Sequence, residues 1–299
     1  MDLQRVAPLH PQFDPALGLL RLELDHGKAN EIGSVELDAL DALCDLLEHD
    51  DSIRCLCTTS RRSSARGTKI FISGANVSER VGWSDERVKQ HVLRQRELMR
   101  RLRHVPVFTV ALTHGVTFGW GVEFLLTADY TIATDTARFS LPETGLGIVP
   151  GARGTAELAL QIGPAQALRL GCTGEEIDAA TAHQIGLVHE LAPSLDDGLT
   201  RVAQLAARLA TRSPTAVAAY KRGLLTALGR PEAERLAIER AAYELCVDSG
   251  EAAIGRAAFS ARRADSPKTD PKPSPASPET TIAAPTSPAW GARRLEPPR

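Results

Sequence analysis

Hydrophobic residues in the first two thirds of the chain switch between two spacings. Short apolar or alternating runs, typical of strands, cover residues 17–24, 53–59, 70–72, 107–112, 130–133 and 138–140. Helical spacing covers residues 34–48 with Ser34 as N-cap, 85–103, a segment beginning at 123, then 155–162 and 165–170. Strands that alternate with helices predict βαβ units and an α/β fold. From residue 177 onward the pattern is almost wholly helical.

The last residues have a different composition. Nine of the 19 prolines lie between Pro267 and Pro298, and Ser, Thr, Lys and Ala fill most of the rest. Such a segment buries too little apolar surface to offset its ordering entropy, which predicts disorder. Trp290 is its one aromatic residue, either a docking anchor or incidental. We therefore divide the chain into an N-terminal extension (1–14), a core (15–195), a helical region (196–263) and a disordered tail (264–299).

Composition narrows the function classes. The chain has 299 residues, 43% of them hydrophobic, which is enough for a full core. Its 35 basic and 37 acidic side chains nearly cancel, so nothing global indicates nucleic acid or an anionic membrane surface. No apolar run approaches the roughly 18 residues of a membrane span. Without an apolar signal region in residues 1–14, the chain is expected to be soluble and cytoplasmic.

The cysteines do not indicate a metal site. Their number is odd and no pair has ligand spacing; they are Cys44, Cys55, Cys57, Cys172 and Cys246. Cys55 and Cys57 flank one residue of a predicted strand, so they should share a face as buried, reduced thiols.

Two glutamates are the candidate catalytic groups. Glu123 ends the glycine-rich segment that runs from Thr113, and Glu143 follows Leu141-Pro142 near a predicted helix start. A carboxylate within an apolar segment is costly to bury unless a function retains it. Two such carboxylates could share one water and move protons in both directions. Taken singly, Glu143 could be a helix-start carboxylate and Glu123 a polar residue at a chain turn.

Several segments, in order, resemble the crotonase family, the enoyl-CoA hydratase/isomerase superfamily. They are Gly27-Lys28-Ala29-Asn30, residues 69–77 with Ser73-Gly74-Ala75-Asn76, the glycine segment ending in Glu123, and residues 141–155. The resemblance covers roughly residues 15–263. It implies a spiral of ββα turns followed by a helical trimerisation region, and a homotrimer or a dimer of trimers.

The resemblance also implies the chemistry. Family members bind acyl-CoA thioesters and stabilise an enolate-like oxyanion with two main-chain N–H groups, each worth about 2.7–4 kcal/mol in the transition state. In this chain the matching donors are Ala75 and Trp120. Trp120 stands where relatives carry glycine, and its side chain could narrow the acyl site or pack outward against a helix or neighbouring subunit.

Both acids of the hydratase subgroup are matched here, by Glu123 and Glu143. The resemblance therefore implies syn addition of water to a 2-enoyl-CoA, with no metal and no cofactor beyond the coenzyme A of the substrate. An enoyl-CoA isomerase, an acyl-CoA hydrolase or lyase, and a non-catalytic acyl-CoA-binding paralogue remain alternatives.

The resemblance places coenzyme A against Lys28, Ala29, Lys69 and Gly74. Besides Trp120, three positions depart from the family pattern. Asn76 replaces an aspartate, Ser78 replaces a lysine, and Arg153 stands where relatives often have glycine, at a helix start or near a polar acyl group.

Overall fold

The computed structural model divides the chain into two compact units, residues 1–207 and 208–299. The structure describes residues 2–264 and 289–293. The sequence-based boundary between core and helical region was set at 195/196, whereas the division between the units falls inside the helix α7 (Leu195–Ala210). Most of the predicted disordered tail, 264–299, lies outside the described residues.

The first unit repeats a strand–strand–helix sequence. In each repeat the first strand joins one sheet and the second joins another, and a helix returns the chain. The repeats are β3 (Cys55–Ser60), β4 (Ile70–Ile72) and α2 (Asp85–His104); β5 (Phe108–Thr113), β6 (Val116–Phe118) and α3 (Trp120–Leu125); and β7 (Tyr130–Thr134), β8 (Arg138–Ser140) and α4 (Gly154–Ile162). This confirms the predicted α/β class and the ββα spiral.

The two sheets are mostly parallel. The larger has the order β1-β2-β3-β5-β7-β10, with β1 (Pro11–Asp14) antiparallel to β2 (Leu19–Leu24) and β10 (Glu190–Ala192) at the other edge. The smaller has the order β4-β6-β8-β9, with β9 (Ile177–Asp178) antiparallel to β8. Strands β1, β6, β9 and β10, of two to four residues each, were not predicted.

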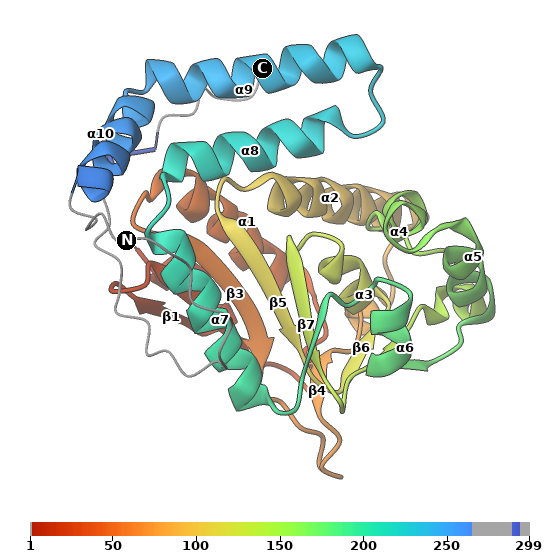
Figure 1. The fold of residues 1–299 in the computed structure, drawn as a ribbon. Coiled ribbons are helices and arrows are strands. Elements are labelled where there is room, and N and C mark those ends of the chain that lie inside the picture. The colour runs from red at the N-terminus through yellow and green to blue at the C-terminus, as the bar shows by residue number, and fades with distance from the viewer. Residues whose placement is uncertain (1, 265–288, 294–299) are drawn as a thin grey trace. The chain divides into compact units, whose positions relative to one another are not determined.

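Helices cover both faces of the larger sheet. On one face lie α1 (Ser34–His49) and α2, and on the other lies α7 (Figure 1). Gly198 of α7 lies against β5, where an added Cβ would be 2.5 Å from Leu112 Cδ1. Cys55 and Cys57 are buried free thiols, as predicted.

The remaining short elements of the first unit connect these layers. They are η1 (Gln4–Leu9), η2 (Val77–Arg80), η3 (Pro142–Leu146), α5 (Pro164–Thr173) and α6 (Ala179–Gln184). The prediction of Ser34 as an N-cap was wrong by one position. Gly33 is the cap, and the Glu36 carboxylate accepts its N–H at 2.9 Å.

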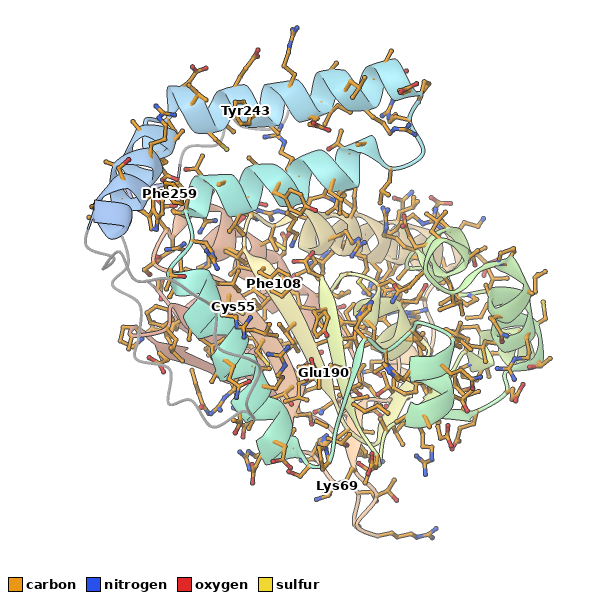
Figure 2. The ribbon with its side chains drawn as sticks, viewed as in Figure 1. Cys55, Lys69, Phe108, Glu190, Tyr243 and Phe259 are labelled. Atoms are coloured by element: carbon orange, nitrogen blue, oxygen red, sulfur yellow. The ribbon has the colours of Figure 1, made fainter. Side chains whose placement is uncertain are left out.

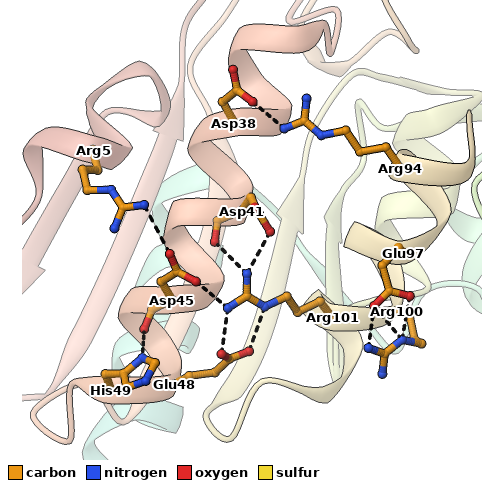
Figure 3. Close-up of polar contacts among 10 residues, drawn as sticks. All are labelled: Arg5, Asp38, Asp41, Asp45, Glu48, His49, Arg94, Glu97, Arg100 and Arg101. Carbon is orange, nitrogen blue, oxygen red and sulfur yellow. Dashed lines mark hydrogen bonds and ion pairs between the residues drawn. The ribbon is translucent and has the colours of Figure 1, made fainter. Parts of the chain in front are cut away.

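An ionic cluster joins α1 to α2. Arg101 of α2 reaches three carboxylates of α1: Asp41 at 2.8 Å, Asp45 at 2.6 Å and Glu48 at 2.7 Å (Figure 3). Only 25% of the Arg101 side chain is exposed, so these pairs are less screened than ordinary surface pairs. The cluster fixes α2, which supplies side chains to the site described below.

The second unit is helical, with α8 (Pro214–Ala227), α9 (Glu232–Asp248) and α10 (Glu251–Ala264). Ser213 caps α8, and the buried Glu251 carboxylate accepts hydrogen bonds from the Ser213 and Thr215 hydroxyls. Tyr243 and Phe259 are 71% and 62% exposed (Figure 2). Trp290 lies against Gly255 and donates its indole N–H to the Thr211 carbonyl at 3.3 Å.

Candidate active site

One main-chain amide of the candidate site follows β4. Ile32 bridges this segment by donating to the Gly74 carbonyl at 3.0 Å and accepting from Asn76 N–H at 2.8 Å. Successive peptide groups of an extended chain point to opposite edges, so Ala75 N–H points away from Ile32. No acceptor for it exists within the described ranges. Gly74 has φ +138°, a conformation open only to glycine at little cost.

A second amide begins α3. Gly119 (φ +51°) donates to the Ser140 carbonyl at 2.9 Å, and Trp120 is the first residue of the helix. A first-turn N–H has no acceptor inside its own helix, and no other described group accepts from Trp120 N–H. An ideal Cβ at Gly119 would be 4.0 Å from Gly74 Cα. The two segments therefore abut, each with an available N–H directly after a positive-φ glycine.

The Trp120 side chain is packed inside the first unit. It is 2% exposed and stacks on Phe124, with 5.6 Å between ring centroids. The Trp120 side chain therefore does not pack outward. Close packing instead restricts the next residue, because a Cβ at Gly121 would collide with the Ile72 carbonyl oxygen.

Glu123 lies one turn into α3 and is 3% exposed. Its Oε1 accepts hydrogen bonds from Ala152 N–H at 2.8 Å and Gly154 N–H at 2.7 Å. Burial raises the pKa of Glu123 to about 7, with the Glu143 charge adding to the rise and the two N–H donors opposing it. The side chain is thus fixed in place and able to gain or lose a proton near neutral pH.

Glu143 lies in η3 and is partly buried. Burial raises the pKa of Glu143 as well. Its Oε2 is buried, and no described group donates a hydrogen bond to it. Its Oε1 lies 2.8 Å from the ideal Cβ position of Gly119, beside the second amide. The structure therefore places the Glu143 carboxylate beside the second amide segment, and the Glu143 charge acts on the buried carboxyl of Glu123.

The loop that holds Glu123 is itself anchored. Arg96 of α2 donates to the Gly151 carbonyl at 3.1 Å, and its charge lowers the pKa of Glu123 against the larger effect of burial. Arg153 has φ +88°, which explains why glycine suits this position. Its guanidinium pairs with Glu157 one turn along α4. Nothing in the sequence distinguished Arg96 from the other arginines of its helix.

The segment expected to bind coenzyme A lies beside the first amide segment. Ala29 accepts a hydrogen bond from Ser73 N–H at 3.2 Å. The fully buried Asn30 amide donates to Ser60 Oγ and to the Phe71 carbonyl, each at 2.9 Å. Asn30 therefore ties the turn at residues 26–30 to the end of β3 and to the middle of β4.

Lys28 and Lys69 are exposed on this side of the first unit, Lys69 visibly so (Figure 2). Arg62 lies between them: its guanidinium donates to the Lys28 carbonyl at 3.4 Å, and its own carbonyl accepts from Ile70 N–H at 3.0 Å. The guanidinium of Arg62 also pairs with Asp25 at 2.7 Å, which offsets its charge. The two exposed lysines are therefore the side chains of this region that suit a polyanion such as the phosphates of coenzyme A.

Asn76 and Ser78 have local roles or none. Asn76 Oδ1 accepts from Glu79 N–H at 3.3 Å and caps η2, which an aspartate would do equally well. Ser78 is exposed.

Across the described part of the chain, His, Cys, Asp and Glu side chains form no group of three or more suited to a metal. None of the helices described combines the length and hydrophobicity needed to cross a membrane.

Comparisons with known proteins agree with this architecture. The family model "Enoyl-CoA hydratase/isomerase" matches residues 35–267. YngF of Bacillus subtilis is 34% identical over 236 residues, 79% of this chain and 88% of YngF. The mouse protein "Enoyl-CoA hydratase domain-containing protein 2, mitochondrial" is 32% identical, with 84% of each chain covered. A crystal structure of enoyl-CoA hydratase from Bacillus anthracis superposes with a TM-score of 0.75 at 28% identity, covering 82% of this chain and 93% of that one.

The chain belongs to the enoyl-CoA hydratase/isomerase family, within the crotonase superfamily. Members of this family act on acyl-CoA thioesters.

Proposed function

We propose that this protein is an enoyl-CoA hydratase that adds water in a syn manner to a 2-enoyl-CoA thioester and gives the 3-hydroxyacyl-CoA. The observation that supports the proposal is the Glu143 carboxylate beside the segment of Gly119 and Trp120, with the Glu143 charge and burial raising the pKa of Glu123. The hydratase name of the Bacillus anthracis protein supports the same reaction class.

The amides of Ala75 and Trp120 would donate to the thioester oxygen. That oxygen gains negative charge when water attacks C3, so both donors bind the transition state more strongly than the ground state. Lys28, Ala29, Lys69 and Gly74 would hold the coenzyme A portion and set the position of the carbonyl. No cofactor besides the coenzyme A of the substrate is needed in this scheme.

The two glutamates would complete the addition. One carboxylate takes a proton from the water as the C3–O bond forms, and the other, protonated, gives its proton to C2 as the enolate returns to the thioester. A carboxyl with a pKa near 7 is suited to either direction at neutral pH. Burial raises the pKa of both groups, which favours the protonated form that one of them needs in order to give up a proton.

The test is a turnover panel of 2-enoyl-, 3-enoyl- and 3-hydroxyacyl-CoA thioesters, analysed by mass spectrometry, for the wild type, Glu123→Gln and Glu143→Gln. Hydration should fall by about 10²-fold or more in each variant. An isomerase moves one proton with a single carboxylate, so strongly unequal effects with 3-enoyl turnover would overturn the proposal. Acyl-CoA binding without turnover of any thioester would indicate a non-catalytic relative.

We also propose a homotrimer, or a dimer of trimers, in the cytoplasm. Exposed apolar residues of the second unit, such as Tyr243 and Phe259, are available for contacts between subunits. Free buried thiols at Cys55 and Cys57 are consistent with a reducing compartment. Light scattering of the purified full-length protein would test the trimer, and fractionation of the source cells would test the location.

A further inference from the structure

Several side chains of the first unit have buried N–H groups without a described acceptor, and three of these side chains, Arg80, His91 and Gln95, belong to η2 and α2. Within the described ranges no group accepts a hydrogen bond from Arg80 Nε and Nη2, His91 Nε2 or Gln95 Nε2. His91 and Gln95 are 9% and 3% exposed. Unpaired buried donors are uncommon in folded proteins, and a group of them requires an explanation such as a bound ligand.

Arg80 has the geometry of an anion site. Its unpaired Nε and Nη2 lie on the same edge of the planar guanidinium, the edge that binds both oxygens of a carboxylate in parallel. No acidic side chain described in the structure forms an ion pair with it. Burial lowers the pKa of Arg80 from its usual value, yet the guanidinium stays charged.

The neighbouring acid, Glu79, offers one unpaired acceptor, because its Oε1 is buried without a hydrogen-bond partner, and its charge acts on Arg80 without an ion pair between them. Glu79 Oε2 accepts from Ser34 N–H at 3.0 Å, and its Oε1 lies 3.5 Å from His91 Nε2. That separation is an ionic contact only when His91 is protonated, and burial with the Arg80 charge lowers the pKa of His91. Donors therefore outnumber acceptors here.

The group borders the candidate active site on two sides. Arg80 ends η2, which begins two residues after Ala75, the first of the proposed oxyanion donors. His91 and Gln95 are one turn apart on α2. The adjacent residues of that helix contact the loop that holds Glu123: Val92 lies 3.0 Å from the ideal Cβ of Gly151, and Arg96 donates to the Gly151 carbonyl.

We propose that Arg80, with His91 and Gln95, binds a carboxylate at the far end of the acyl group, so that the preferred substrate is the mono-coenzyme-A thioester of an unsaturated dicarboxylic acid. This inference rests on the proposed function of the same site. A hydrocarbon chain would leave the guanidinium edge and both neutral donors unpaired, whereas a carboxylate supplies acceptors for all of them.

The test compares matched pairs of 2-enoyl-CoA thioesters, one ending in a carboxylate and the other in a methyl group, at several chain lengths. The wild type should show a kcat/KM about tenfold or more higher for the carboxylate member. Arg80→Met should lose about tenfold or more on that member and stay within about threefold on the methyl member. Arg80→Lys, which keeps the charge without the fork, should fall between them.

Arg94→Met is the matched control, because Arg94 is on α2 with His91 and Gln95 but pairs with Asp38 at the surface. It should leave the ratio between the two substrates unchanged. Equal preference in the wild type, or equal losses on both substrates in Arg80→Met, would overturn the inference. If circular dichroism shows that the Arg80 variants do not fold, the wild-type preference between the carboxylate and methyl substrates decides the inference by itself.

A binding measurement tests the carboxylate preference independently of the proposed reaction. Calorimetry with saturated acyl-CoA thioesters of the same two kinds measures carboxylate preference without turnover. If no thioester is hydrated but the carboxylate preference is present and is lost in Arg80→Met, the reaction is wrong and the ligand class is right. If hydration occurs with no such preference, the reaction holds and the ligand class is wrong.

Discussion

Gly119 leaves space for the carboxylate of Glu143: an ideal Cβ at Gly119 would lie 2.8 Å from Glu143 Oε1. Gly119 also has φ +51°, so alanine there is strained as well as crowded. We expect Gly119→Ala to lower kcat for hydration by about 10²-fold, because the displaced carboxylate no longer reaches the shared water.

Gly171→Ala provides the control for this substitution. Gly171 lies inside α5, and a Cβ there would meet nothing within 4 Å. Turnover should be unchanged, and the free energy of unfolding should rise by about 0.5–1 kcal/mol. Wild-type kcat in Gly119→Ala would show that Glu143 is not used from its position in the structure.

The amide of Trp120 can be tested apart from its side chain. Trp120 is the first residue of α3, a position that proline occupies readily because its missing N–H has no helical acceptor. Trp120→Ala and Trp120→Pro both remove the indole, but only the second removes the donor. The proline variant should have a kcat lower than the alanine variant by about 10²–10³-fold.

Both Trp120 variants should be destabilised, because the alanine change alone costs about 3–5 kcal/mol for a buried tryptophan. Rates are therefore compared at a temperature where circular dichroism shows both to be folded. Equal kcat values would remove Trp120 from the oxyanion site.

The raised pKa of Glu123 predicts a pH-dependent stability. A carboxyl whose pKa is near 7 in the folded state and near 4.5 unfolded favours folding while it is protonated. The free energy of unfolding should thus be highest below about pH 4.5 for this group and fall as pH rises through 7, by about 3 kcal/mol in all.

Glu123→Gln should flatten this dependence and make the protein more stable than the wild type at pH 8, as measured by urea unfolding at fixed protein concentration. Glu232→Gln, at an exposed position of α9, controls for the change in net charge. An unchanged pH slope in Glu123→Gln would mean that the group is ionised in the folded protein.

Arg101 of α2 pairs with three carboxylates of α1, so its removal should lower the free energy of unfolding. We expect Arg101→Met to lower the free energy of unfolding by about 1–2 kcal/mol, since several coupled pairs are lost at a partly buried site. Arg100→Met should cost about 0.5 kcal/mol or less, because Arg100 is 51% exposed and pairs with Glu97 on its own helix. Equal losses would show that the helix junction does not depend on this cluster.

The sequence predicted the long elements and some short ones. The strands Ile70–Ile72 and Arg138–Ser140 were predicted with the bounds observed, and α2 within one residue. Strand β6, by contrast, follows Gly115 for only three residues and exists through its pairing with β4 and β8. Pairing of that kind depends on distant segments, which a single local pattern does not contain.

The candidate catalytic residues came from a family resemblance, and the structure adds what holds them. The two N–H donors to Glu123 come from residues 152 and 154, about thirty positions away, so their geometry required the fold. The importance of Arg80 was hidden in the polar run Ser78-Glu79-Arg80, which resembles a solvated surface. Only burial of its Nε and Nη2 without partners distinguishes it.

A Cβ added at Gly119 or Gly121 would meet other atoms, whereas Trp120 between them already carries a buried side chain that stacks on Phe124. Any amino acid other than proline supplies an N–H at position 120, so the donor does not require a run of three glycines. Proteins with a bulky middle residue in this segment thus remain candidates for thioester chemistry, provided that their interior accommodates that side chain as this one accommodates the indole.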